Sequence, residues 1–351
     1  MTAILRLRPE RLRELSLVVV IGLAVLLFSF LIDDYLSGSF FNRITTSVAI
    51  TAVLAAGQTI VILTRNIDLS VGSVVGVTAY LTGEYLQSHP DTAPLLAVGL
   101  AVAIGAGLGA INGLLVAYGR VPSIIVTLGT LAVYRTWLIN HAEAQTITAD
   151  SLPDWLIKLP NSTLFSIGDL DVRTVVAAAV VLILCLQWTL GNLKWGRSVY
   201  AVGSNPDAAT QAGLRVNRVV LGAFVASGAL AGLAGFMFLS RFGTITVVAG
   251  SGLELQSVAA AVVGGVNIFG GSGTLFGALL GAVLINLLDQ SLLRVPGLSE
   301  FWRDAVLGAL ILIAVAVDFL LGKRLGRLQV SRARRQPSAG VPPEQGAASS
   351  A

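Results

Sequence analysis

The chain has 351 residues, of which 55% are hydrophobic and only 12% are charged. Soluble domains carry about 25% charged residues, so this composition excludes an ordinary soluble protein and indicates a chain that crosses a membrane several times. The net charge of +4 is therefore interpreted as an orientation signal in the membrane and not as a sign of nucleic-acid binding. The single cysteine, Cys185, excludes an intrachain disulfide and a cysteine-based metal site.

Hydrophobic runs of membrane length divide the chain. A transmembrane helix needs about 20 mostly apolar residues. About ten stretches are candidates, at residues 17–32, 46–64, 71–88, 94–117, 122–140, 174–191, 219–240, 254–270, 274–289 and 304–321. The basic segment 1–16 resembles the start of a signal peptide, but no small-residue cleavage site follows, so the first run is expected to be retained. The predicted fold class is an all-α polytopic membrane protein with its membrane domain at 17–321.

Basic residues orient these spans. Ten spans place both termini on one side, and most of the 23 basic residues then fall on that same side, which the positive-inside rule identifies as the cytoplasm. The loop 192–218 is then cytosolic, and the amphipathic loop 141–173 is external. The tail 322–351 begins basic and ends in a low-complexity stretch that is typical of disorder.

A weak internal repeat relates the two halves of the membrane domain. The segment 106–122 resembles the segment 278–296 in its small residues, its Leu-Leu pair and its final Val-Pro. The two copies lie on the fourth and ninth spans, so they face opposite ways in the membrane. This pattern predicts an inverted repeat of five plus five helices, as in many transporters, against the alternative of chance similarity between Gly/Ala-rich helices.

The longest polar stretch between spans, residues 196–218, contains the signals of one short helix. Asn205 suits the N-cap, Pro206 the first helical position and Asp207 the positive end of the helix dipole. Gly213 suits a left-handed terminus. The helix is either part of a structured loop or a docking element for a cytosolic partner. The residues assigned to this coupling role are Arg197, Ser204, Asn205, Pro206, Asp207, Ala208, Gln211 and Gly213.

Polar residues interrupt the apolar pattern near the second and third spans. Arg65, Asn66 and Asp68 follow the second span, and Asp68 and Ser70 can cap the third. Ionisable residues at a membrane span are costly and often mark function. The stretch is either a gate beside the translocation path or a simple cytosolic turn.

Other polar residues within the spans carry the same two interpretations. Gln58, Thr127, Gln256 and Ser257 either face a polar path or bond a neighbouring helix. Arg135 either lines that path or extends its guanidinium to the membrane surface. Hydroxyl and amide groups of this kind suit a neutral polyol better than an ion.

Several motifs are absent from the sequence. No GxxxxGK[ST] phosphate loop, HExxH or GxSxG occurs. The deep parts of the spans are almost free of charge, whereas ion-coupled carriers commonly hold charged residues there. We therefore expect no catalytic activity and no cofactor in this chain, and we expect another subunit to supply the energy. An ion-coupled secondary sugar carrier remains the alternative of another class.

Four ordered motifs over residues 45–320 resemble the membrane permeases of ribose-type bacterial ABC sugar importers. They are Ile67–Ser73, Pro122–Thr130, Gly196–Arg197 with Ala201–Asn205 and Ala208–Ala209, and Ala259–Gly273. The resemblance implies a multi-pass protein of the bacterial inner membrane that imports a monosaccharide by alternating access.

The same resemblance implies a set of partners. These are a second permease, as a homodimer or a paralogue, two cytosolic ABC ATPases that bind ATP and Mg²⁺, and an external sugar-binding protein. It places the ATPase-coupling helix at residues 205–212.

Departures from the ribose-type pattern bear on the cargo. The residues Thr64–Asn66, Leu292–Pro296 and Phe301–Asp304 are most similar to permeases for rhamnose and for autoinducer 2. Rhamnose is the favoured cargo on this resemblance, with autoinducer 2 or another pentose or hexose as the alternative.

Overall fold

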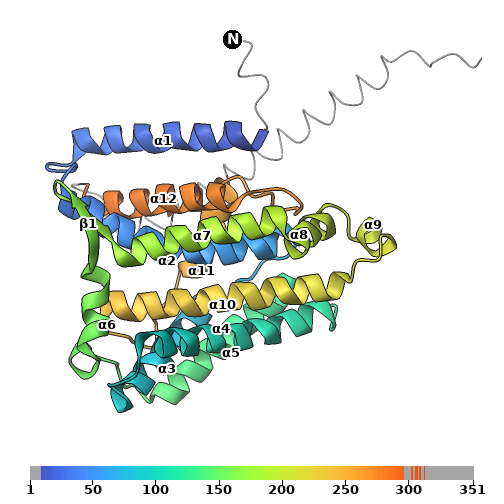
Figure 1. Cartoon of the computed structure of the whole chain (residues 1–351), viewed down its shortest axis with the longest axis horizontal. Helices are drawn as coiled ribbons and strands as arrows, with labels where there is room; N and C mark the ends of the chain where they lie inside the picture. Colours follow the sequence, from blue (N-terminus) through green and yellow to red (C-terminus); the bar gives the residue numbers. More distant parts are fainter. Residues whose placement is uncertain (1–8, 296–301, 303–304, 307, 310–311, 313–351) are drawn as a thin grey trace, which may run out of the picture.

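A computed structural model describes residues 9–295 and, beyond them, residues 302, 305–306, 308–309 and 312. Its long helices lie side by side along one direction (Figure 1). They are α1 (Pro9–Leu31), α2 (Gly38–Leu63), α3 (Val71–Ser88), α4 (Pro94–Ala117), α5 (Ser123–Ala142), α7 (Thr174–Asn192), α10 (Val216–Phe242) and α12 (Leu275–Leu292). The tenth expected span and the predicted tail lie outside the described residues.

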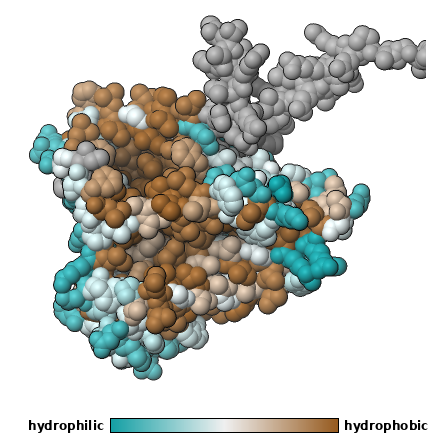
Figure 2. All heavy atoms as spheres, in the orientation of Figure 1, coloured by the Kyte–Doolittle hydropathy of each residue, from teal (hydrophilic) through white to brown (hydrophobic). Residues whose placement is uncertain are grey.

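Seven of the helices in the described part of the chain are long and apolar enough to cross a membrane, namely α1, α2, α4, α5, α7, α10 and α12. The helix α3 has 18 residues but more polar side chains. Figure 2 shows apolar side chains over the middle of the bundle and hydrophilic ones gathered at its two ends. This distribution matches a lipid environment around the middle, and it confirms the predicted all-α polytopic fold.

The eighth expected span, 254–270, forms only a short helix. The helix α11 (Leu253–Val263) has 11 residues, about half the length that a bilayer requires. Gly264 ends it and Gly265 adopts a left-handed φ of +89°. The apolar residues that follow therefore form a loop, and the prediction of a full span here is wrong.

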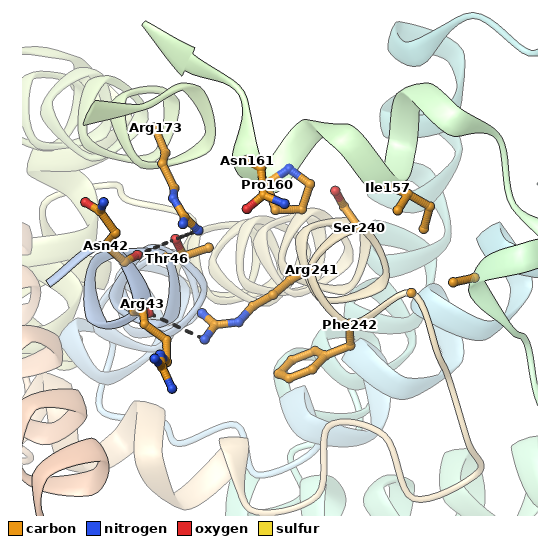
Figure 3. A pocket seen from close by; sticks show the side chains of 12 residues that line it. Asn42, Arg43, Thr46, Ile157, Pro160, Asn161, Arg173, Ser240, Arg241 and Phe242 are labelled. Atoms are coloured by element: carbon orange, nitrogen blue, oxygen red, sulfur yellow. Dashed lines mark hydrogen bonds between the residues drawn. The ribbon is translucent and has the colours of Figure 1, made fainter. Parts of the chain in front are cut away.

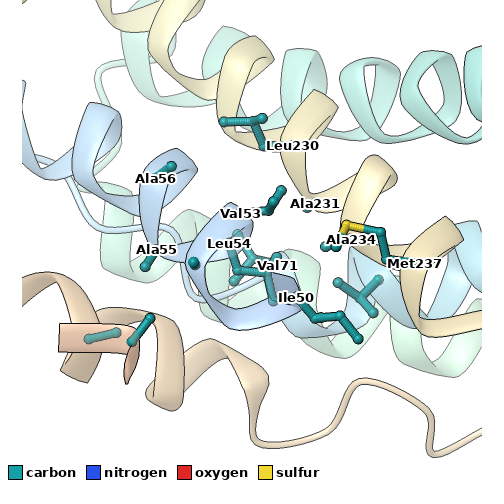
Figure 4. Close-up of a cluster of buried hydrophobic side chains, with 14 of the residues drawn as sticks. Ile50, Val53, Leu54, Ala55, Ala56, Val71, Leu230, Ala231, Ala234 and Met237 are labelled. Atoms are coloured by element: carbon teal, nitrogen blue, oxygen red, sulfur yellow. The ribbon is translucent and has the colours of Figure 1, made fainter. Parts of the chain in front are cut away.

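The second span begins earlier than predicted, at Gly38 and not at residue 46. In its apolar window 94% of the residues are buried within the protein, so α2 is the central helix. Its aliphatic side chains pack against α10 and the start of α3, as Ile50, Val53 and Leu54 do around Ala231, Ala234 and Met237 (Figure 4).

The most extensive helix contact joins α4 and α10. Small residues make it close, because a Cβ at Gly105 would collide with the Gly228 carbonyl and one at Gly232 with the Ala101 carbonyl. Glycine allows backbones to approach in this way, and such contacts are typical of membrane helices.

Equivalent elements of the two halves make equivalent contacts. In the repeat, α2 corresponds to α10, α3 to α11 and α4 to α12. The contacts of α10 with α4 and α3 are matched by those of α2 with α12 and α11, and the contact of α3 with α4 is matched by that of α11 with α12. A non-helical segment also precedes both α3 and α11. This correspondence supports the predicted repeat for the helices α2–α4 and α10–α12.

The two ends of the bundle differ. The helices α8 (Lys194–Ser204) and α9 (Pro206–Gln211) lie at one end, and the expected external loop lies at the other (Figure 1). That loop contains η2 (Ala149–Ser151), α6 (Asp154–Lys158), η3 (Leu159–Asn161) and an unpredicted antiparallel hairpin of β1 (Thr163–Ile167) and β2 (Leu170–Arg173). Leu156 of α6 is fully buried, so part of the apolar face of this loop packs on the rest of the protein.

Candidate functional site

The short helix α9 is built as the sequence indicates. The Asn205 side-chain oxygen accepts hydrogen bonds from the backbone N–H groups of Asp207 (3.1 Å) and Ala208 (3.0 Å). Pro206 occupies the first turn, and Gly213 has a left-handed φ of +81°. Capping of both ends holds a helix of six residues that would not be stable alone.

One face of α9 packs on the protein and the other is free. Ala209 is 5% exposed, whereas Asp207, Ala208 and Gln211 are exposed. The preceding helix α8 buries Gly196, Val199, Val202 and Gly203 and exposes Arg197. The pair therefore presents a small polar surface at the end of the bundle, which a partner can contact.

Arg65 connects the turn after α2 to the end of α8. Its Nε donates to the Gly203 carbonyl (2.5 Å) and its Nη2 to the Ser204 carbonyl (2.6 Å). The Gly271 N–H donates to the Leu63 carbonyl (3.1 Å) in the same place. Arg65 therefore joins the turn after α2 to the loop 192–218.

The chain folds back beside α2 after this turn. With its amide oriented to satisfy both groups, Gln58 donates to the Asp68 carbonyl and accepts from the Asp68 N–H, each at 3.1 Å. Gln58 is fully buried and Asp68 is 1% exposed. Asn66 bonds locally, to the Thr64 carbonyl at 2.9 Å. The helix α3 thus begins alongside the last turns of α2 and not beyond its end.

Buried polar groups join this break to α4 and α5. The Asp68 carboxylate accepts from the Ser70 hydroxyl (2.6 Å) and N–H (3.0 Å), and Asn112 of α4 donates to the Ser70 hydroxyl (2.7 Å). Thr127 of α5 lies 3.4 Å from the Ile67 carbonyl. These predicted path residues therefore hold helices together, and buried hydrogen-bonded groups of this kind are costly to unpair.

Arg135 bonds to the backbone of the segment that precedes α11. Its Nη1 donates to the carbonyls of Val247 (2.9 Å) and Ala249 (2.6 Å). The guanidinium thus holds the segment 243–252 against α5. That segment leads into α11, where the Ser257 hydroxyl donates to the Glu254 carbonyl (2.9 Å).

A cavity of about 640 Å³ with both polar and apolar lining residues opens toward the end of the bundle opposite α9, between α2, α10, α11 and α12. Of the predicted path residues, Gln256 lines it. Sequence reasoning missed Thr51, Asn286 and Asp289, which line it as well. The i, i+3 spacing of Asn286 and Asp289 in an otherwise apolar helix was the signal that could have identified them.

A second cavity of about 520 Å³ shares Arg241 and Phe242 with the first. Arg43 of α2, Arg173 of β2 and Arg241 of α10 line it (Figure 3). Arg173 donates to the Thr46 hydroxyl (3.0 Å), and no carboxylate of a described residue forms a salt bridge with these three side chains. The end of the bundle opposite α9 thus carries a cluster of positive charge that suits acidic groups.

No metal centre is built in the described part of the chain, where no three His, Cys, Asp or Glu side chains gather to hold an ion. The described geometry consists of a capped short helix at one end of the bundle, a set of buried polar contacts next to it and two cavities at the opposite end.

Comparison with known proteins adds to this geometry. The family model described as "Branched-chain amino acid transport system / permease component" matches residues 40–315. The autoinducer 2 import system permease protein LsrC of Yersinia pseudotuberculosis serotype O:1b (strain IP 31758) is 39% identical over 287 residues, 81% of this chain and 78% of that protein. The protein of the same name from Yersinia pestis (strain Pestoides F) has the same identity and coverage.

No solved structure matches the chain. The family model covers both the helix break and the coupling loop, and the relatives extend over most of both chains. The chain therefore belongs to the ABC transporter permease family that is described as the permease component of branched-chain amino acid transport systems.

Proposed function

We propose that this protein is the membrane subunit of an ATP-driven importer that carries a small sugar-like solute into the cytoplasm by alternating access. The carrying observation is α9, a capped helix with an exposed polar face at one end of a membrane bundle. Two ABC ATPases bind ATP and Mg²⁺ and dock on this face, and both termini lie in the cytoplasm with it. The chain itself binds no cofactor.

The face of α9 that meets the ATPase contains Asp207 and Gln211. Ala209 packs on the permease, which leaves the opposite side of the helix free. The exposed Asp207 carboxylate and the Gln211 amide offer hydrogen-bonding groups to a groove on the ATPase. Arg197, exposed on α8, adds a cation beside them.

The cargo passes through the polar cavity between α2, α10, α11 and α12. Hydroxyl, amide and carboxylate groups line it, and groups of this kind hydrogen-bond a polyol. The names of the relatives favour autoinducer 2 over rhamnose as the cargo, and rhamnose remains the alternative. The basic cavity beside it receives acidic groups of an external binding protein, and a second permease completes the membrane unit.

Uptake into sealed vesicles that contain the permease, its ATPase and its binding protein tests the coupling assignment. Asp207→Ala combined with Gln211→Ala should abolish uptake and the stimulation of ATPase activity. The matched control is Asn192→Ala, because Asn192 is an exposed amide at the same end of the bundle that bonds only within α7. Normal uptake by the double variant would refute the assignment.

Two further measurements fix the class and the cargo. Uptake that requires ATP and resists ionophores distinguishes the proposal from an ion-coupled secondary carrier. Competition of labelled autoinducer 2 uptake by an excess of rhamnose or ribose separates the candidate cargoes. Competition by rhamnose alone would reverse the preference for autoinducer 2.

A further inference from the structure

Three backbone segments meet around Arg65 at the cytosolic end of the bundle. They are the turn after α2, the last turn of α8 and the glycine loop 267–273. A Cβ at Gly203 would collide with the Leu63 carbonyl, and one at Gly270 with the Arg65 side chain. The segments therefore touch through their backbones, which leaves little room for independent movement.

Arg65 is fixed at both of its ends. Its backbone has a left-handed φ of 66°, which is uncommon for a residue other than glycine and is held by its surroundings. Its planar guanidinium bonds two successive carbonyls, those of Gly203 and Ser204. These carbonyls lie at the negative end of α8, where a cation is favoured.

The guanidinium and the backbone of Arg65 lie next to two different elements. The Ser204 carbonyl directly precedes Asn205, the cap of α9. Three residues beyond Arg65, Asp68 is held by both hydrogen bonds of Gln58, and Ser70 is held by Asn112. The Arg65 side chain therefore joins the end of α8 to the turn that leads into α3, beside the backbone contacts of Gly203 and Gly271 with Leu63.

We propose that Arg65 is a positioning residue that transmits the motion of the coupling loop to the break between α2 and α3. This inference rests on the proposed function, because it requires an ATPase that moves α9. The contacts form a continuous chain of packed and hydrogen-bonded groups, and only a measurement of coupling turns such a chain into a pathway.

The test uses the complete importer in vesicles with three variants. Arg65→Asn keeps a residue that tolerates the left-handed conformation but cannot reach α8. Arg65→Lys keeps the charge but loses the paired geometry. The matched control is Arg120→Ala, since Arg120 also has a left-handed φ of 56° in an exposed turn and forms no side-chain hydrogen bond to a described residue.

We expect Arg65→Asn to lower uptake by at least about tenfold, the effect of losing one charge-assisted hydrogen bond, while the ATPase still binds and turns over. Arg65→Lys should lie between this variant and the unchanged protein, and Arg120→Ala should match the unchanged protein. Hydrogen exchange supplies a second readout. Nucleotide should alter exchange at residues 64–70 in the unchanged protein but not in Arg65→Asn, although exchange at α9 still responds.

Three results would overturn the inference. Normal uptake by Arg65→Asn would show that transport does not require the hydrogen bonds between Arg65 and α8. Loss of ATPase binding together with uptake would show that Arg65 only holds the loop in place. Equal losses in Arg65→Asn and Arg120→Ala would show a general defect of cytosolic turns. Failure of the proposed function is distinct, because then the unchanged chain would bind no ATPase.

Discussion

Asn205 illustrates how much a single side chain determines at the coupling end. Its oxygen satisfies two N–H groups of α9, and the helix has only six residues. We predict that Asn205→Ala destabilises α9 by about 1 kcal/mol and weakens ATPase binding. Hydrogen exchange at residues 206–211 and affinity measurements check this. Asn205→Asp retains a capping oxygen and should behave as the unchanged protein, and equal behaviour of both variants would contradict the capping role.

Ser70 makes the corresponding contribution in the interior of the protein. It donates to Asp68 and accepts from Asn112, so Ser70→Ala leaves buried polar groups short of a partner. We predict that the free energy of unfolding falls by about 1–3 kcal/mol, which a lower unfolding temperature in detergent would show. Ser88→Ala, at an exposed serine, should leave that temperature unchanged. An unchanged temperature for Ser70→Ala would show that the break does not depend on this hydroxyl.

At the residue scale, the sequence was sufficient to predict local capping residues but not the distant hydrogen-bond partners of the other polar residues. Asn205, Pro206 and Gly213 were interpretable because capping is a local property. The roles of Gln58 and Arg65 depend on partners 10 and 138 or more positions away, which no local pattern reveals. The inward contacts of Arg135 with Val247 and Ala249 were hidden for the same reason.

At the scale of elements, the glycines between α4 and α10 define the closest helix contact. We predict that Gly228→Leu destabilises the protein by about 3 kcal/mol, because a side chain there meets the backbone of Gly105 and Gly109. Thermal unfolding in detergent measures the change. Gly107→Leu is the matched control, since a Cβ at Gly107 has no neighbour within 4 Å. A similar loss in both variants would attribute the effect to helix properties and not to packing.

At the scale of elements, hydrophobicity predicted the boundaries of two helices correctly and missed the start of α2. The range of α4 matches the prediction, and α3 does so as well. The short length of α11 was not predictable from hydropathy, because the loop after Gly264 is also apolar. This loop packs against other parts of the protein, where Val266 is fully buried. Hydropathy measures the surroundings of a segment and not its conformation.

At the scale of the whole molecule, the two ends carry different chemistry. We predict that Arg43→Gln combined with Arg173→Gln slows uptake by weakening attraction for an acidic external binding protein, and that the deficit shrinks as salt rises because screening already weakens the interaction. Uptake rates at several ionic strengths check this. Arg294→Gln, outside both cavities, is the control, and a salt-independent deficit would contradict an electrostatic role.

The close contact of α4 with α10 has a consequence for the transport cycle. The two helices pack backbone against backbone. The helix α10 begins shortly after α9 and ends at Arg241 and Phe242, which line both cavities. In the proposed importer, this packed pair is then a stiff connection between α9 at one end of the bundle and the cavities at the other.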